Sequence, residues 1–308
     1  NVQQASSMHG ILLSLFPLIA LIVVGYVLKR TAYLNDGFWA GAEKLNYYIL
    51  FPAMLFGNLA TAQIDLSMVN TILIILAVMF GLSCAVLYLL KKILNIHPAR
   101  FGVFTQSNVR FNTYIGLAIV ASLFQTEGMT IFAILLAISI PIVNIISVLA
   151  LTEQDGMDVK TIVKSLVKNP LIMGCVVGIA FNFSGLNLWD GINHFIKQLA
   201  ICSLPLGLMC VGAALQFMAL KKDLLPLIVN TFSRLIIMPL LAFFVCKWFG
   251  FSDLETQIFV LYFALPTASA SYILTKVLGG DSQLMAGVIS LQIICAAITL
   301  PIVLTLVM

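Results

Sequence analysis

Two polar stretches interrupt long apolar runs in this chain of 308 residues. The first, residues 105–116, contains an arginine, two asparagines, a glutamine and several hydroxyl side chains. The second, residues 264–272, contains one proline and four hydroxyl side chains. Guanidinium, amide and hydroxyl groups can hydrogen-bond carboxylates and other oxyanions. Neither stretch contains an aspartate or a glutamate, so both are suited to binding an anion and lack a carboxylate for proton transfer.

Both stretches are expected to break the helices that carry them. Pro266 removes a backbone hydrogen bond and disfavours helix at residue 265, and Asn, Ser and Thr side chains can bond the backbone groups that are freed. The second half of each broken helix then begins with unpaired N–H groups, which attract anions. The candidate binding residues are Asn108, Arg110, Asn112, Thr113, Tyr114, Pro266, Ser269, Ser271 and Tyr272.

The two arginines inside apolar runs receive different interpretations. Arg110 lies beside a predicted helix start, where its guanidinium could hold a carboxylate through two parallel hydrogen bonds. The alternative is a structural arginine that bonds backbone carbonyls. Arg234 has fewer polar neighbours and is interpreted as structural or interfacial. The six cysteines lie singly in apolar runs, and we predict no catalytic residue and no metal site.

Composition identifies the environment of these residues. The chain is 61% hydrophobic and 9% charged, with a mean hydropathy of +1.10, whereas soluble domains are about 25% charged. This excludes a soluble enzyme and a nucleic-acid-binding protein. A membrane-spanning helix needs about 20 apolar residues. We therefore predict an all-α polytopic membrane protein with ten transmembrane helices, at 11–28, 45–64, 69–90, 101–126, 128–152, 169–189, 198–220, 224–246, 256–275 and 282–308.

The basic residues between these segments predict the orientation. Positive residues concentrate on the cytoplasmic side of membrane proteins. With the N-terminus outside, only Lys197 and Lys247 flank the outer ends, and twelve basic residues flank the inner ends. Both termini are therefore predicted to be extracytoplasmic, in the plasma (inner) membrane. The inner residues are Lys29, Arg30, Lys44, Lys91, Lys92, Arg100, Lys160, Lys164, Lys168, Lys221, Lys222 and Lys276.

The chain contains an internal repeat. Residues 137–143 and 297–303 are identical at five of seven positions, and Lys44 precedes Pro52 by the same interval as Lys197 precedes Pro205. The alternative is chance similarity between apolar helices. Five helices per copy require opposite orientations in the membrane, an arrangement typical of secondary transporters. The predicted parts are an N-terminal extension (1–8), a first repeat (9–152), a cytoplasmic linker (153–168) and a second repeat (169–308).

Prolines within the second and seventh predicted spans suggest two further breaks. Pro52 and Pro205 occupy matching positions in the two repeats. We expect each to break its helix, with a simple kink as the alternative.

The chain resembles the auxin efflux carrier family, in particular its bacterial-type members, over residues 10–308. The resemblance rests on residues 44–52, on 110–114 with Gly116, on Pro266, and on 300–301. It implies two inverted five-helix repeats, with helices 4 and 9 broken and crossing at the midplane. It also implies a scaffold of helices 1, 2, 6 and 7, and a transport domain of helices 3–5 and 8–10.

The resemblance further implies a class of substrate. Family members carry organic anions such as auxin-like acids or malonate, and Asn112 matches the asparagine at their crossover. Arg110 and Phe111 stand where the plant carriers have an asparagine–proline pair, and the long central loop of those carriers is missing. Both departures argue against auxin itself. A more distant resemblance is to the bile acid:sodium symporter fold, in which crossover oxygens hold sodium with help from acidic residues.

These observations predict a secondary transporter and not an enzyme. We expect efflux of small organic anions (carboxylates) by an elevator or rocking mechanism, without a cofactor. Sodium- or proton-coupled symport is the alternative, and a sensor that binds the anion without transporting it is a second alternative. The expected partners are the organic anion and the lipid bilayer, with no nucleic acid, and a homodimer through the scaffold helices is one arrangement that we consider.

Overall fold

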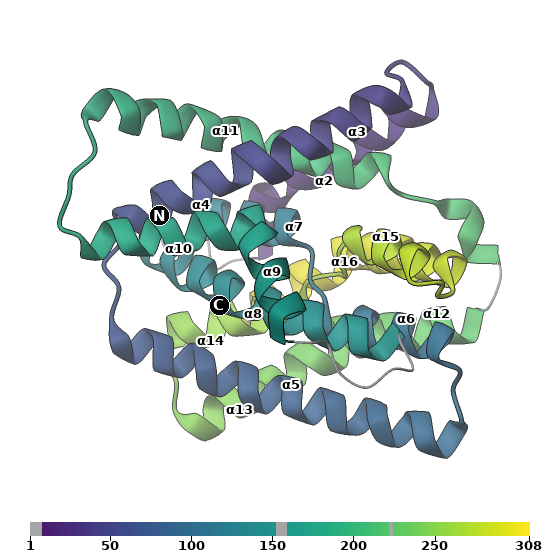
Figure 1. Ribbon diagram of the computed structural model, residues 1–308. Helices are drawn as coiled ribbons and strands as arrows, with labels where there is room; N and C mark the ends of the chain where they lie inside the picture. Colours follow the sequence, from purple (N-terminus) through teal and green to yellow (C-terminus); the bar gives the residue numbers. More distant parts are fainter. Residues whose placement is uncertain (1–7, 152–158, 222–223) are drawn as a thin grey trace.

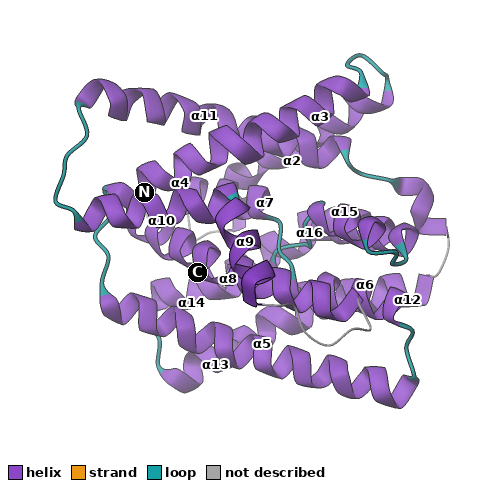
Figure 2. Cartoon of the chain, in the orientation of Figure 1, coloured by secondary structure: helices purple, strands orange, loops and turns teal. Residues whose placement is uncertain are grey.

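The computed structural model describes residues 8–151, 159–221 and 224–308. This part of the chain is helical, and no strand occurs in it (Figure 2). Six of its helical segments are long and apolar enough to cross a membrane. They are α2 (Met8–Arg30), α5 (Leu66–Leu94), α8 (Thr126–Leu151), α11 (Asp190–Ala213), the α12–α13 segment (Leu224–Phe249) and α16 (Ser282–Val307).

The other helices are shorter or interrupted. A helix over residues 36–60 consists of α3 (Asp36–Leu45), the π turn η1 (Asn46–Leu50) and α4 (Phe51–Ala60). Two pairs are separated by non-helical residues: α6 (Pro98–Val109) from α7 (Thr113–Leu123), and α14 (Asp253–Ala264) from α15 (Ala270–Val277). The remaining elements are α9 (Val159–Lys168), α10 (Pro170–Phe183) and the 3-10 turn η2 (Phe217–Lys221). Within the fifth apolar segment, the π turn η3 (Ser233–Ile237) joins α12 (Leu224–Phe232) to α13 (Met238–Phe249).

Some of the predicted parts lie outside the described residues. These are most of the N-terminal extension, at 1–7, the last residue of the first repeat, at 152, and the first part of the linker, at 153–158. The second half of the linker forms α9 and leads directly into α10, which Asn169 caps by accepting the N–H groups of Leu171 and Ile172.

Close helix packing joins α2 to α11 and α4 to α10 (Figure 1). A Cβ added to Gly212 would lie 1.8 Å from the carbonyl oxygen of Ile22, and one added to Gly25 would lie 2.0 Å from that of Met209. Gly174 in α10 approaches the backbone of α4 in the same manner, because its Cβ would lie 2.8 Å from the oxygen of Pro52. Small residues therefore let these backbones touch, as is common between helices in membranes.

The remaining long helices form a second group. In Figure 1, α5 and α13 lie on the side of the molecule opposite α2 and α11. In this group α8 packs on α6, and α14 packs on both α13 and α16. Fully buried aromatic side chains, among them Phe132 and Phe259, fill its interior. Outward faces carry exposed apolar side chains such as Phe16 of α2 and Leu89 of α5, as a lipid-facing surface requires.

The expected breaks at Pro52 and Pro205 are wrong. Pro205 lies inside the continuous helix α11, and Pro52 lies in the first turn of α4, which continues from η1 without a gap. A proline removes only one backbone hydrogen bond and clashes with one carbonyl. At Pro52 the preceding π turn, with the N–H of Phe51 bonded to the oxygen of Asn46, widens the backbone next to the proline ring. Neither proline lies within a run of polar residues as dense as those at the breaks described next.

Candidate functional site

Two helix breaks meet at the centre of the candidate site. The structure confirms the expected interruptions, since α6 ends at Val109 before α7 begins, and α14 ends at Ala264 before α15 begins. The backbone N–H of Asn112 in the first break donates to the oxygen of Pro266 in the second, at 2.8 Å. The hydroxyl of Thr267 donates to the oxygen of Gln106 at 2.9 Å. The two breaks are therefore bonded directly to each other.

Two glutamines satisfy other groups at this contact. Gln292 of α16 accepts the backbone N–H of Thr267 at 2.7 Å and donates to the oxygen of Ser107 at 3.2 Å. Gln106 donates from Nε2 to the hydroxyl of Thr275 at 2.8 Å. Both glutamine side chains are fully buried. Gln292 is not among the residues expected from the sequence, although a glutamine inside an apolar run is a signal that could have identified it.

Arg234 bonds the ends of both broken helices. It is fully buried in η3 and donates from Nη1 to the oxygen of Asn108 at 2.7 Å. Its Nε and Nη2 donate to the oxygens of Leu265 and Tyr262, at 2.7 and 2.8 Å. These bonds confirm the structural interpretation of Arg234 and show which backbone groups it satisfies.

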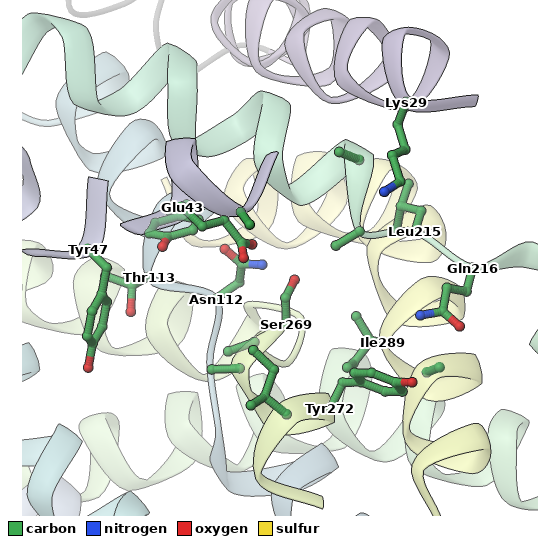
Figure 3. Close-up of a pocket in the computed structure, with 18 of the residues that line it drawn as sticks. Lys29, Glu43, Tyr47, Asn112, Thr113, Leu215, Gln216, Ser269, Tyr272 and Ile289 are labelled. Carbon is green, nitrogen blue, oxygen red and sulfur yellow. The ribbon is translucent and has the colours of Figure 1, made fainter. Parts of the chain in front are cut away.

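The starts of α7 and α15 border a cavity of about 900 Å³ (Figure 3). Five predicted residues lie in its wall: Asn112, Thr113, Tyr114, Ser269 and Tyr272. Asn112 is also the N-cap of α7, because its Oδ1 accepts the N–H of Ile115 at 3.1 Å. Ser269 Oγ is buried and has no hydrogen-bond partner in the described part of the chain, so it is available to a ligand.

The other four predicted residues lie outside this wall: Asn108, Arg110, Pro266 and Ser271. Asn108 accepts the hydroxyl of Ser233 at 2.6 Å, and Ser271 lies 3.3 Å from Thr267 between hydroxyl oxygens. Pro266 supplies its carbonyl to the contact between the breaks. Asn108, Pro266 and Ser271 therefore stabilise the two helix breaks instead of lining the cavity.

Arg110 also uses its guanidinium within the protein. Its Nε donates to Gln106 Oε1 and its Nη2 to Asn144 Oδ1, both at 3.0 Å. It acts electrostatically on Tyr47, which lines the cavity. Arg110 therefore lies outside the cavity wall, and its guanidinium bonds two side-chain amides.

The opposite wall comes from α2, α3 and η1 and carries charge. Lys29, Arg30, Lys44 and Glu43 line it together with Tyr47, and Lys29 forms an ion pair with Asp36. The three basic residues entered the sequence-based prediction only as markers of orientation, and Glu43 was not among the expected site residues. The basic residues at the ends of two different helices, Lys29 and Arg30 in α2 and Lys44 in α3, were the sequence signal that could have predicted this wall.

Glu43 is the acidic residue among the described residues of this wall. It precedes the apolar run 45–64, and burial raises the pKa of its carboxyl above the ordinary glutamate value, while the nearby Lys29 opposes that rise. Its charge also acts on Tyr114 of α7 and Cys210 of α11. The cavity therefore combines three basic side chains, one glutamate whose pKa is raised by burial and two helix N-termini, which together favour a negatively charged ligand.

Comparison with known proteins places the chain among transport proteins. A family model described as membrane transport protein matches residues 11–164 and 157–304. An uncharacterized transporter of Methanothermobacter thermautotrophicus is 24% identical over 288 residues, which cover 92% of this chain and 94% of that protein. An uncharacterized transporter of Methanocaldococcus jannaschii is 25% identical over 281 residues, covering 86% and 89%.

Proposed function

The chain belongs to the membrane transport protein family, the family of the auxin efflux carriers, and we propose on that premise that it is a secondary transporter of small organic anions. The observation that carries the proposal is the cavity, where the N-terminal ends of α7 and α15 meet a wall with three basic side chains. Half-helix N-termini that face a central cavity are a recurrent means of binding anionic substrate groups in transporters. We propose Asn112, Thr113 and Ser269 as ligands of a carboxylate.

We propose that ten helices cross the membrane as two inverted repeats. The broken pair α6–α7 then corresponds to α14–α15, and α8 to α16, which has the same length of 26 residues. Pro141 and Pro301 match within the repeated segments 137–143 and 297–303. The repeats pair α2 with α10 and α4 with α11. The packing of α2 on α11 is then the counterpart of the packing of α10 on α4, and both contacts are observed. The two breaks then cross near the midplane.

The mechanism that we propose is alternating access between the two helix groups. The scaffold is α2, α3–α4, α10 and α11, and the transport domain is the rest of the helical chain. The cavity lies between them, because Lys29 and Glu43 belong to the first group, and Asn112 and Ser269 to the second. Movement of the second group along the first, by an elevator or rocking motion, would carry the bound anion across. Coupling to sodium or protons is the alternative mode, and a sensor is the alternative function.

We propose the plasma membrane as the location, with both termini extracytoplasmic. The cavity then opens toward the cytoplasm, because Lys29 and Arg30 line it and positive residues favour that side. Impermeant thiol reagents applied outside intact cells should label a cysteine that replaces the exposed Lys247 and spare one that replaces the exposed Lys92. Labelling at Lys92 from outside would contradict the orientation.

Transport is tested by flux and binding measured on the same preparation. Proteoliposomes should accumulate a labelled dicarboxylate or aromatic monocarboxylate, and the Asn112→Asp variant should not, because its added negative charge repels the anion. A thermal-shift screen of the two anion classes selects the probe. Saturable binding without flux would favour the sensor, and absence of both would reject this site as an anion site.

A further inference from the structure

The two helix breaks create a position that demands positive charge. Asn108 lies at the C-terminal end of α6, and Tyr262 and Leu265 lie at the C-terminal end of α14. Each helix C-terminus carries a partial charge of about −0.5, so two of them together carry about −1. Within a membrane, water cannot satisfy the unpaired carbonyls.

Transporters with broken helices commonly meet this demand with an exchangeable ion. Half-helix C-terminal ends and unwound carbonyls are the groups that bind a coupling sodium ion or proton. In this chain one guanidinium donates to carbonyls of both helix ends, with three N···O distances of 2.7–2.8 Å. Arg234 is 0% exposed, and the ion pairs found in the described residues do not include it. Its single positive charge therefore matches the charge of the two helix ends.

We propose that Arg234 is a tethered cation, held permanently at the carbonyl-lined position that a coupling ion would otherwise occupy. Because the guanidinium is covalently attached, it cannot be released in each cycle, and a sodium gradient cannot do work through this position. The π turn η3 supplies the geometry, since its wider turn carries Arg234 at the contact between α6 and α14. The mechanistic part of this inference rests on the proposed transport function, whereas the charge requirement does not.

Chemical rescue tests the charge requirement without any transport assay. Arg234→Gln and Arg234→Lys should both lower the thermal unfolding temperature of the purified protein, and the lysine variant should lose less, because it keeps the charge while both retain a donor. For Arg234→Ala, millimolar methylguanidinium should restore at least half of the lost Tm in a saturable manner. The uncharged analogue methylurea should have no effect. A glutamine variant as stable as the lysine variant, or equal rescue by methylurea, would overturn the proposal.

Two controls complete the experiment. Arg110→Ala removes a guanidinium that bonds side-chain amides, so methylguanidinium should not raise its Tm, and equal rescue there would mark the effect as unspecific and overturn the inference. If Arg234→Ala does not fold, the lysine and glutamine pair decides. In wild-type proteoliposomes, anion flux should be unchanged when choline replaces sodium at fixed potential. Flux that requires sodium overturns the tethered-cation role, whereas absence of flux in both salts rejects the proposed function instead.

Discussion

Asn112 takes part in folding and lines the candidate site, and substitutions can separate the two contributions. Its Oδ1 caps α7 through the N–H of Ile115, while the residue borders the cavity. Aspartate caps helices as well as asparagine, whereas alanine costs about 1 kcal/mol at an N-cap. We expect Asn112→Asp to retain the wild-type Tm and lose anion binding, and Asn112→Ala to lose stability as well. Isothermal titration with the selected anion, beside a thermal melt, measures both quantities. Anion affinity unchanged in Asn112→Asp would place the site elsewhere.

Glu43 should make anion binding depend on pH. Burial raises the pKa of its carboxyl, so the residue takes up a proton at a higher pH than an ordinary glutamate does, and the cavity then loses a negative charge. Affinity for an anion should therefore rise as the pH falls through this pKa. Glu43→Gln should bind more tightly than wild type at high pH and show a flatter profile.

The pH experiment needs a probe whose own charge is constant. A small organic sulfonate stays ionised throughout, so any pH dependence belongs to the protein. Lys29, Tyr114 and Cys210 interact electrostatically with Glu43, and Arg30, Lys44 and Tyr47 line the same cavity. The same raised pKa also affects the stability of the fold. Because the folded-state pKa of Glu43 lies above the unfolded-state pKa, wild type should lose stability as the pH rises from the unfolded-state pKa through the folded-state pKa. A Glu43→Gln variant with the wild-type pH profile would exclude Glu43 as the titrating group.

At the scale of elements, glycine contacts hold α2 against α11. A methyl group at Gly212 would lie 1.8 Å from the oxygen of Ile22, so Gly212→Ala must push the helices apart. Overpacking of this kind costs about 1–3 kcal/mol. Gly81 of α5 has no atom within 4 Å of an added Cβ, and alanine there should be neutral or stabilising by up to about 1 kcal/mol, as helix propensity predicts. Thermal melts of the two variants should therefore shift in opposite directions, or by clearly different amounts. Equal Tm values would contradict the backbone contact.

The helices show which sequence signals determine a break. Dense polar residues, accompanied in the second stretch by Pro266, predicted both interruptions correctly. In the structure Asn112 and Thr267 each donate a hydrogen bond to the opposite broken helix. Proline alone misled at Pro205, where the helix continues because only one bond is lost. A proline is thus a weak signal unless polar side chains and a partner segment can satisfy the backbone it frees.

The cavity wall shows what the sequence could not predict. Five of nine candidate residues line the cavity, and they all lie at or near the two helix starts that the polar stretches identified. Lys29 and Glu43 belong to different helices, and only the packing of α2, α3 and α11 brings them to the same space. Arg110 lies outside the cavity wall for the same reason, because its guanidinium donates a hydrogen bond to Asn144 of α8, 34 positions away. Local patterns predicted helix ends, and long-range packing decided their neighbours.

At the scale of the whole molecule, the position of the cavity between two helix groups links the site to movement. Tyr114 of α7 stacks on Phe51 of α4, with ring centroids 4.6 Å apart and planes at 9°. This contact joins the proposed transport domain to the proposed scaffold next to the site. Occupation of the cavity by an anion would alter the charge between Lys29 and the start of α15, and so bias the relative positions of the two groups.

The driving force follows from the charge that crosses. Because Arg234 stays attached to the proposed transport domain and returns with it in each cycle, the net charge that crosses in uniport is that of the substrate anion. Moving one negative charge outward across an inside-negative membrane gains about 2.3 kcal/mol per 100 mV. At about 1.4 kcal/mol per decade of concentration, this supports a gradient of roughly forty-fold. Efflux from proteoliposomes with a potassium–valinomycin potential, at symmetrical pH and without sodium, should therefore accelerate as the interior becomes more negative, and slow when the potential is reversed. Flux that ignores the potential and follows a sodium or proton gradient would reject uniport and favour coupled symport.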